Sequence, residues 1–221
     1  MFHAHIQNRM PWGKRLEEFI KVPPDRANAR NIERHWSCTS VVTFPGISTD
    51  RCVLEQFAEK HLTERYVSWL NDPDVVKFSE KRHRTHDLVS CRKYFDSFAD
   101  TPHYFVAIVS KDQALGHIGN LNAYVDVNNG TADVGILLGE KGAWGQGIGT
   151  EVWSAFCKFL LTDRKLRKVT AGTSANNAGM LSIMRRSGMR EDGKRVKQLI
   201  INGREVDIVH AALFDEPFPK L

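Results

Sequence analysis

The sequence contains no apolar run of the length that a membrane span requires, which is about 20 consecutive apolar residues. Its N-terminal residues carry histidines and basic side chains and lack the apolar centre of a secretory signal. There is no C-x-x-C pair, so the cysteines indicate reduced core thiols and not a disulfide or zinc framework. The scattered cysteines are Cys38, Cys52, Cys91 and Cys157. We therefore expect a cytoplasmic protein without a membrane partner.

Internal repeats and low-complexity segments are also lacking, and the 221 residues are 42% hydrophobic, which is enough to form a core. Residues 1–46 differ from the rest: they contain Pro23-Pro24 and Pro45-Gly46, have poor periodicity, and carry seven Lys or Arg against four acidic residues. We expect an accessory N-terminal extension, 1–46, followed by one domain, 47–221. The extension would pack along the outside of the domain or onto a second subunit, as in a homodimer.

The basic extension would suit an anionic partner such as RNA, or it could simply be solvated. The sequence has no helix-turn-helix, no RNA-binding aromatic motif and no zinc signature. We therefore expect no nucleic-acid partner.

Glycine is concentrated in one run, residues 145–151, which reads Gly-Gln-Gly-Ile-Gly-Thr-Glu. The run follows the apolar segment 134–138 and precedes apolar residues with helical spacing between Ile148 and Leu160. Three glycines thus lie where a strand gives way to a helix. Backbone N–H groups there can turn toward an anion, with the positive end of the helix dipole behind them. The run predicts a site for a phosphorylated ligand.

Two common phosphate-binding loops do not fit this run. No Lys-Ser or Lys-Thr follows the last glycine, which excludes the NTPase loop. The glycines lie at i, i+2 and i+4 without repeating βαβ units around them, which disfavours a dinucleotide-binding loop. The spacing instead resembles the acyl-CoA loop of the GCN5-related N-acetyltransferase (GNAT) superfamily, (Gln or Arg)-x-x-Gly-x-(Gly or Ala). Gly147-Ile148-Gly149 would supply Gly-x-Gly, and Trp144 occupies the Gln/Arg position.

The run beginning at Trp144 is similar to the Rim-type branch of that superfamily, which includes ribosomal-protein, antibiotic and amino-sugar acetyltransferases. A second motif follows at a suitable distance: Asn177-Ala178-Gly179-Met180 and then Ser187-Gly188-Met189 resemble the opening and the close of the family's next helix. The resemblance covers about residues 50–215. It implies an α/β fold of GNAT type, with a mixed, mostly antiparallel sheet flanked by helices and preceded by the N-terminal extension.

The periodicity of the chain agrees with that fold. Alternating or continuous apolar runs predict strands, i, i+3, i+7 spacing predicts helices, and Asn128-Asn129-Gly130 and Asn202-Gly203 predict hairpin turns. Thr63 is placed to cap the first helix. The expected strands are 51–57, 103–109, 116–127, 131–138, 168–173, 195–201 and 205–214. The expected helices begin near residues 64, 86, 148 and 178.

The resemblance implies acetyl-CoA as the donor substrate, attacked at its thioester carbonyl by the acceptor amine. Loop amides would hold the pyrophosphate, and in relatives the pantetheine arm pairs with the exposed edge of the fourth strand. The matching residues are Ile136, Leu137, Leu138, Trp144, Gly145, Gln146, Gly147, Ile148, Gly149 and Thr150. Asn177 matches an asparagine that bonds the pantetheine or an ordered water in relatives; it could equally cap the helix that begins at Ala178.

Asp133 is the candidate general base. A lysine-like amine has a pKa of ~10.4, so its neutral form costs roughly 4 to 5 kcal/mol at pH 7, which a carboxylate can reduce. Asp133 lies eleven residues before Trp144, the offset of the glutamate base in the histone-acetylating branch, but its shorter side chain calls for a bridging water. The alternative is that Asp133 faces solvent at the hairpin. Met184 stands where many relatives have a tyrosine acid, which leaves Ser182 or bulk water.

In this superfamily the connection between the first two helices and the hairpin of the third and fourth strands wall the acceptor pocket. Here the connection, residues 78–86, is dense in charge and imidazole, although it could simply be an exposed loop. Arginines suit a phosphate or carboxylate, and a carboxylate could hold the incoming ammonium. The acceptor-binding candidates are Glu80, Arg82, His83, Tyr124 and Asp126. The histidines have no further metal ligands near them in sequence, so we expect no metal.

Basic residues combined with a carboxylate favour a small-molecule amine acceptor that is anionic, such as a nucleotide-linked amino sugar. A protein N-terminus of the ribosomal-protein type is one alternative. A CoA-binding module without catalytic activity is another, and the methionine at position 184 favours it.

Overall fold

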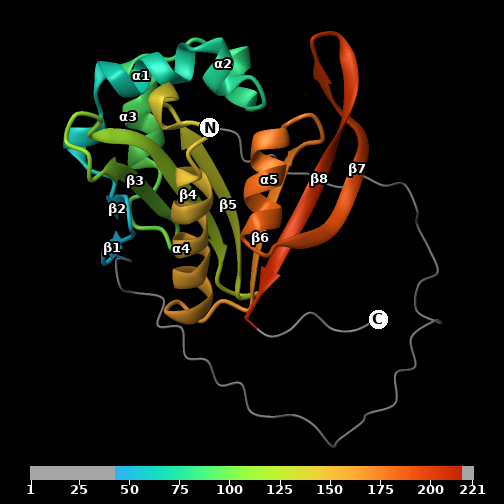
Figure 1. Cartoon of the computed structure of the whole chain (residues 1–221). Helices are drawn as coiled ribbons and strands as arrows, with labels where there is room; N and C mark the ends of the chain where they lie inside the picture. The colour runs from blue at the N-terminus through green and yellow to red at the C-terminus, as the bar shows by residue number, and fades with distance from the viewer. Residues whose placement is uncertain (1–42, 216–221) are drawn as a thin grey trace, which may run out of the picture. The chain divides into compact units, whose positions relative to one another are not determined.

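The structure is a computed structural model and describes residues 43–215 (Figure 1). The strands are β1 (Ile47–Ser48), β2 (Cys52–Gln56), β3 (Tyr104–Ser110), β4 (His117–Asp126), β5 (Thr131–Leu138), β6 (Lys168–Ser174), β7 (Arg190–Ile201) and β8 (Arg204–Phe214). The α-helices are α1 (Glu64–Asn71), α2 (Pro73–Val76), α3 (Leu88–Asp96), α4 (Ile148–Thr162) and α5 (Ala178–Arg186). Short 3-10 helices are η1 (Glu59–His61), η2 (Glu80–His83) and η3 (Lys141–Ala143).

All eight described strands form one sheet in the order β1-β2-β3-β4-β5-β6-β8-β7. Every neighbouring pair is antiparallel except β5 and β6, which are parallel. Helices flank the sheet, with α4 on the side that faces the reader in Figure 1. The predicted fold class, a mixed and mostly antiparallel sheet flanked by helices, is confirmed.

Strand β3 carries the centre of the core because it is buried on both faces, as its continuous apolar sequence predicts. Tyr104 points toward α4 and contacts Phe159 with ring centroids 5.5 Å apart. Phe105, the next residue, points to the other face and stacks on Phe57 at 4.2 Å. Since successive side chains of a strand alternate between faces, this one strand joins the layer of α4 to the layer of α1 and α3.

Local signals set most of the element boundaries. The Thr63 side chain accepts a hydrogen bond from the Tyr66 amide and caps α1, as predicted. Asn202 and Gly203 both have positive φ, 51° and 73°, which is the backbone that a tight two-residue hairpin turn requires. Strand β7 begins at Arg190, five residues earlier than predicted, because its first residues continue to pair with β8.

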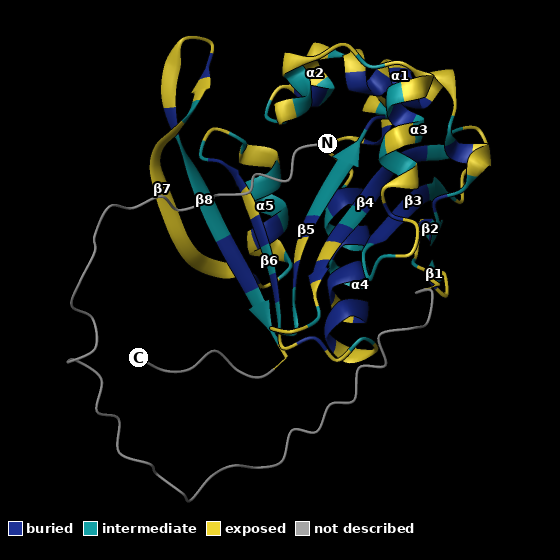
Figure 2. Ribbon diagram, turned by 180° about the vertical axis from the view of Figure 1, so that it is seen from behind, coloured by how far each residue is buried: buried dark blue, intermediate teal, exposed yellow. Residues whose placement is uncertain are grey.

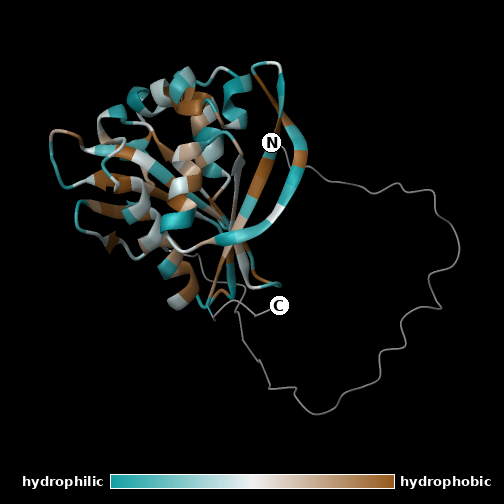
Figure 3. Ribbon diagram, turned by 45° about the vertical axis from the view of Figure 1, so that its right-hand side comes forward, coloured by the Kyte–Doolittle hydropathy of each residue, from teal (hydrophilic) through white to brown (hydrophobic). Residues whose placement is uncertain are grey.

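The hairpin of β7 and β8 extends beyond the rest of the sheet, and its tip reaches the level of α2 in Figure 1. Strand β7 is exposed along almost its whole length and largely hydrophilic (Figures 2 and 3). Two register shifts interrupt its pairing, where Gly193 has φ 143° and Lys197 has φ 52°. Bulges of this kind twist an edge strand, so the edge is poorly suited to pair with another strand.

The expected extension, residues 1–46, lies outside the described residues except for its last four. Within those four, Phe44 is 4% exposed and packs on Phe159, Phe156 and Tyr104 at centroid distances of 5.1, 5.9 and 6.2 Å. Its backbone N–H also donates to Gln56 Oε1 at 3.2 Å. The described end of the extension therefore contributes a core side chain.

None of the described helices is long and apolar enough to cross a membrane. Cys52, Cys91 and Cys157 are buried free thiols. Among residues 43–215, no three His, Cys, Asp or Glu side chains are grouped so that they could hold a metal ion.

Candidate functional site

The site begins where β5 and β6 part. The two parallel strands pair only from Thr131 to Asp133 on β5, and β5 then continues to Leu138 paired with β4 alone. The β6-facing edge of Gly135–Leu138 therefore has no strand partner among the described residues. Ile136, Leu137 and Leu138, the residues predicted to bind pantetheine, lie on this free edge. An extended amide ligand could add to the edge as a further strand does.

The glycine run forms the N-terminus of α4, as predicted. Gly145 and Gly147 have φ of 74° and 81°, values that L side chains rarely adopt. Gly147 is the N-cap and offers no side chain to the helix, whose first intrahelical bond runs from the Glu151 amide to the Gly147 carbonyl at 3.2 Å. The amides of Ile148, Gly149 and Thr150 therefore have no intrahelical acceptor. Uncapped amides at the positive end of a 15-residue helix can bind an anion such as a pyrophosphate.

Arg51, which is distant in sequence, holds this loop through hydrogen bonds. Its Nη1 donates to the Gln146 carbonyl at 2.6 Å, and its Nε donates to Glu151 Oε2 at 2.7 Å. The backbone amide of Arg51 bonds the other carboxylate oxygen of Glu151 at 2.8 Å. Its Nη2 lies 3.6 Å from where a Cβ on Gly147 would stand. A cation thus lies beside the loop. Partial burial raises the pKa of the Glu151 carboxyl, but the hydrogen bonds from Thr49 and Arg51 and the charge of Arg51 lower it overall.

Two contacts bring the loop, the free edge and α5 together. The Trp144 indole N–H donates to the Leu138 carbonyl at 2.9 Å and covers the last residue of β5. A Cβ on Gly149 would stand 2.8 Å from Ile183 Cδ1 and 3.1 Å from Leu138 Cδ1. A Cβ at this position would require the ends of the Ile183 and Leu138 side chains to shift, so α4 approaches both β5 and α5 closely. We expect acyl-CoA to bind along this junction.

Asn177 is the N-cap of α5. Its Oδ1 accepts from the Met180 amide at 3.1 Å, and its Nδ2 donates to Thr173 Oγ1 at 3.1 Å. Both ends of the side chain are therefore engaged in holding the helix start against β6. Its predicted contact with the cofactor stays a prediction. Met184, in the position of the relatives' tyrosine, is 2% exposed and belongs to the core.

Asp133 lies at the last paired position before β5 and β6 part. It pairs with Tyr124 on β4 and with Thr170 on β6, so the three side chains share one face of the sheet. Thr170 Oγ1 donates to Asp133 Oδ1 at 3.1 Å. Asp133 is accessible to solvent, yet the surrounding protein removes part of the hydration of its carboxyl group, and this desolvation raises its pKa. The Thr170 hydrogen bond and the nearby His210 oppose the rise.

A raised carboxyl pKa makes the carboxylate a better proton acceptor. The position of Asp133, at the mouth of the opening between the strands, also suits a group that must reach an amine through water. The position and the pKa both favour the predicted role as base.

Tyr124 lies beside Asp133 and is held by aromatic neighbours. Its ring stacks on Phe98 with centroids 5.8 Å apart, and its hydroxyl lies 3.1 Å from the hydroxyl of Tyr94. Burial raises the pKa of Tyr94 well above its usual value, so that hydroxyl stays protonated. Asp126 is engaged differently: it accepts from the Asn129 amide and side chain at 3.0 and 2.7 Å, which holds its carboxylate in the β4–β5 turn.

The connection 78–86 faces the tip of the β7–β8 hairpin. Arg82 Nη1 donates to Glu80 Oε1 at 2.8 Å, and its Nη2 contacts the Ile200 carbonyl of the hairpin at 3.4 Å. His83 Nε2 lies 3.7 Å from Glu80 Oε2. Of the predicted acceptor residues, Glu80, Arg82 and His83 therefore form one group, and Tyr124 lies with Asp133 in another.

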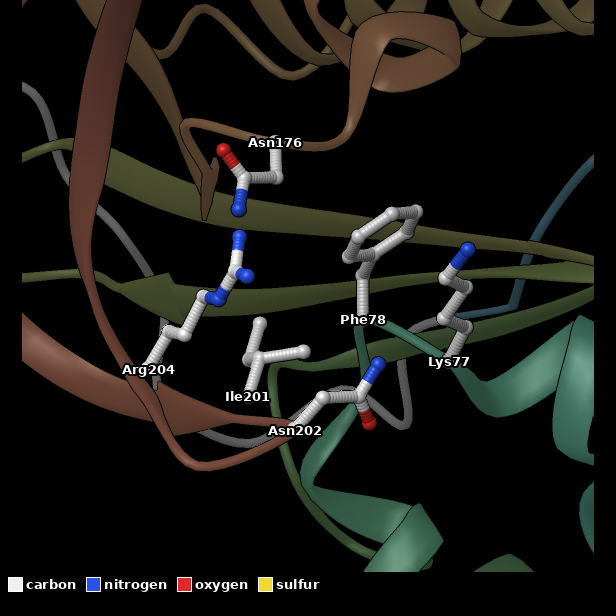
Figure 4. Close-up of a pocket in the computed structure, with 6 residues that line it drawn as sticks. All are labelled: Lys77, Phe78, Asn176, Ile201, Asn202 and Arg204. Carbon is white, nitrogen blue, oxygen red and sulfur yellow. The ribbon is translucent and has the colours of Figure 1, made fainter.

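Two pockets lie between this connection and the hairpin and share part of their lining. The larger, about 890 Å³, includes Arg82, His83 and Arg84 in its wall. The smaller, about 460 Å³, is lined by Lys77, Phe78, Asn176, Ile201, Asn202 and Arg204 (Figure 4). Among the described residues that line either pocket, none is Asp or Glu.

Sequence reasoning missed Arg51, Asn176 and Arg204. Arg51 precedes an ordinary strand and Arg204 follows an ordinary hairpin turn, so neither has a local signal of function. Asn176 immediately precedes Asn177, the first residue of the second motif, and the predicted cofactor contact was assigned to Asn177.

Comparisons with known proteins agree with this geometry. The family model described as "Acetyltransferase (GNAT) domain" matches residues 51–190. The chain therefore belongs to the GNAT acetyltransferase family, whose acyl donor is acetyl-CoA. No curated protein sequence matches the chain.

Solved structures of GNAT enzymes have the same fold. An acetyltransferase of the GNAT family from Bacillus anthracis has a TM-score of 0.66 at 17% identity and covers 78% of this chain and 99% of its own. Spermidine N-acetyltransferase from Vibrio cholerae, in complex with CoA and spermine, has a TM-score of 0.66 at 14% identity. The match covers 74% of this chain and 95% of that enzyme. RimL, a ribosomal L7/L12 α-N-protein acetyltransferase in complex with CoA, has a TM-score of 0.66 at 16% identity. The match covers 76% of this chain and 97% of RimL. At these identities the likeness shows the fold alone.

Proposed function

We propose that this enzyme transfers the acetyl group of acetyl-CoA to the primary amine of a small anionic acceptor, such as a nucleotide-linked amino sugar. The observation that carries the proposal is the charge of the two pockets between the connection 78–86 and the β7–β8 hairpin. Their described lining includes Lys77, Arg82, Arg84 and Arg204 and no carboxylate. A phosphate or carboxylate on the acceptor would be attracted there, and guanidinium groups bind such anions with directed hydrogen bonds.

The same charge argues against a polyamine as the acceptor. The spermidine N-acetyltransferase neighbour acts on a polycation. A polycation entering the pockets of this chain would meet cationic side chains, and like charges brought together in a partly dehydrated site repel. Glu80 is the one carboxylate of the connection 78–86, and its side chain is 70% exposed and paired with Arg82.

The residues would divide the reaction as follows. The uncapped amides at the start of α4 hold the pyrophosphate, and the free edge of β5 aligns the pantetheine arm. Asp133 accepts a proton from the acceptor ammonium, directly or through a water. The neutral amine nitrogen then forms a bond to the thioester carbonyl carbon, the carbon–sulfur bond breaks, and the nitrogen loses its second proton to solvent.

The departing thiolate takes a proton from solvent in this scheme. A thiol has a pKa of ~8.5, so a thiolate leaves tolerably without a dedicated acid. The buried Met184 cannot supply a proton. Tyr124, with its hydroxyl beside that of Tyr94, would form part of the acceptor wall next to Asp133.

The proposal is tested with purified protein, acetyl-CoA and a panel of amines, with free thiol release and the mass of the acetylated product as readouts. The panel includes amino sugars, sugar phosphates carrying an amine, nucleotide-linked amino sugars and spermidine. We expect anionic amines to give the highest kcat/KM. Preference for spermidine would contradict the proposal.

A protein N-terminus is the second candidate acceptor. Its support is the presence of two ribosomal-protein acetyltransferases among the structural neighbours, the RimL enzyme and a ribosomal-protein-S5-alanine acetyltransferase from Vibrio fischeri. Mass spectrometry of ribosomal proteins from a deletion strain separates the two candidates, because only the second predicts loss of an N-terminal acetyl group. A non-catalytic CoA-binding module would bind CoA but would release no free thiol with any amine of the panel.

A further inference from the structure

The smaller pocket has a pair of polar side chains without partners. The side chains of two exposed residues, Arg204 at the start of β8 and Asn176 before α5, form no hydrogen bond and no ion pair with any described residue. Both line the 460 Å³ pocket. In Figure 4 the Arg204 guanidinium and the Asn176 carboxamide point toward one another. Two donor-bearing groups therefore converge without a protein acceptor between them.

Apart from the neutral amide of Asn202, the rest of the described pocket wall is apolar or cationic. The Phe78 ring and Ile201, which is 8% exposed, line the pocket together with Arg204 (Figure 4). Lys77 lies across the pocket with its ammonium 5.4 Å from the centroid of the Phe78 ring. No carboxylate is among the described residues that line this pocket. An aromatic ring beside unneutralised cations suits a ligand with a flat or apolar part next to a negative charge.

The position of the pocket in the fold also suits an acceptor subsite. Asn176 follows β6, the strand that parts from β5 just beyond Asp133, and Ile201 and Asn202 form the hairpin tip that faces the connection 78–86. A molecule anchored at Arg204 would thus lie on the side of the connection and not in the glycine loop at α4.

We infer that Arg204 and Asn176 form an anion subsite that holds a phosphate or carboxylate of the acceptor, with Phe78 packing against the adjoining part of that acceptor. The inference rests on the proposed function, since it specifies how the acceptor is selected. Arginine supplies two parallel N–H donors to such an anion, and the amide adds a third. The subsite selects amines that carry an anionic group over otherwise identical amines that do not.

Matched pairs of amines test the selectivity. Glucosamine 6-phosphate is compared with glucosamine, and an α-amino acid with its amide, so that a phosphate source and a carboxylate source are examined separately. In wild-type protein we expect kcat/KM to be at least tenfold higher for the anionic member of one pair. Arg204→Gln should lower that preference by about tenfold to a hundredfold, the usual scale for a hydrogen bond to a charged group, while the uncharged member changes less than about twofold. Arg204→Lys should retain part of the preference.

Arg195→Gln is the matched control, because Arg195 is an exposed arginine on β7 of the same hairpin and lines neither pocket. It should leave the preference unchanged. The subsite is refuted if wild type shows no preference in either pair, if Arg204→Gln lowers both members equally, or if the control has the same effect as Arg204→Gln.

A binding measurement keeps this test separate from the test of the proposed function. With CoA saturating its own loop, titration calorimetry of inorganic pyrophosphate should detect a further site in wild type and in Arg195→Gln, and none in Arg204→Gln. Absence of thiol release with every amine would count against the proposed function, whereas equal pyrophosphate binding by wild type and Arg204→Gln would count against the subsite.

Discussion

Arg51 and Glu151 lie 100 residues apart in sequence, and the Arg51 Nε donates to Glu151 Oε2 at 2.7 Å in the folded chain. The pair sets the charge at the start of α4. Glu151 lies in the first turn of that helix, next to the amides that would hold the cofactor pyrophosphate, and its carboxylate alone would repel the phosphates. Arg51 neutralises it and also holds the Gln146 carbonyl at 2.6 Å.

Replacing Arg51 should therefore weaken CoA binding without touching the glycine motif. We expect Arg51→Gln to raise the Kd for CoA by about tenfold. The carboxylate of Glu151, whose side chain is 16% exposed, is then left uncompensated beside the expected pyrophosphate site. The double variant Arg51→Gln, Glu151→Gln should recover much of the loss, because both charges are then absent. Calorimetry on the four proteins of this cycle measures the coupling, and additive effects would show that the pair does not act on the cofactor.

The glycine at position 147 can be tested with two nearly isosteric substitutions. Its φ of 81° strains most side chains, but asparagine tolerates this region better than most residues. Gly147→Asn therefore tests the shape of the loop alone, and Gly147→Asp adds a negative charge beside the helix amides. We expect Gly147→Asp to weaken CoA binding at least about tenfold more than Gly147→Asn. If both variants fold and bind CoA with equal affinity, the pyrophosphate does not bind at this turn.

The role of Asp133 is tested by the pH dependence of turnover. Asp133→Asn should lower turnover at pH 7 by roughly 10²-fold or more, with a smaller loss at high pH, where more of the amine is already neutral. A variant with the wild-type rate and pH profile would leave Asp133 as a structural residue.

Thr170→Val gives a second readout on the same carboxylate. The Thr170 hydroxyl donates to Asp133 and favours its charged form, so its removal raises the carboxyl pKa further. A base must be ionised to accept a proton, so the proposed role of Asp133 predicts that activity is lost as the pH falls through that pKa. The acid limb of kcat/KM should therefore move to higher pH in Thr170→Val, while the rate at the plateau changes little. An unmoved acid limb would indicate that a different group titrates.

Phe44 provides a test of where the folded domain begins. It is 4% exposed against three aromatic rings, so Phe44→Ala should lower the free energy of unfolding by about 3 to 5 kcal/mol. A chain that starts at residue 47 should show a similar loss relative to one that starts at residue 43. Both should bind CoA with an affinity close to that of the full chain, because neither truncation removes a residue of the loop. Denaturant unfolding and calorimetry measure the two quantities, and equal stability of the truncated chains would contradict the packing role.

The sequence by itself determined the features that depend on neighbouring residues. Asn202-Gly203 specifies a tight turn because both positions adopt positive φ at low cost, and Thr63 specifies a helix start because its side chain reaches an amide three residues on. The glycine run specified a turn of positive-φ backbone before α4 for the same reason: its backbone conformation is local. Together with the second motif at residues 177–189, these signals were enough to predict the family and the order of nearly all elements.

Only the tertiary structure decided which distant residues meet. The neighbours of Arg51 at the glycine loop come from the other half of the chain, and the pocket joins Phe78 to Asn176 and Arg204 across two other elements of the fold. The β7–β8 hairpin, which the sequence did not connect to the acceptor site, lines the two pockets beside the connection 78–86. Such contacts leave no periodic trace, because they depend on strand register and on the direction of each side chain across the sheet.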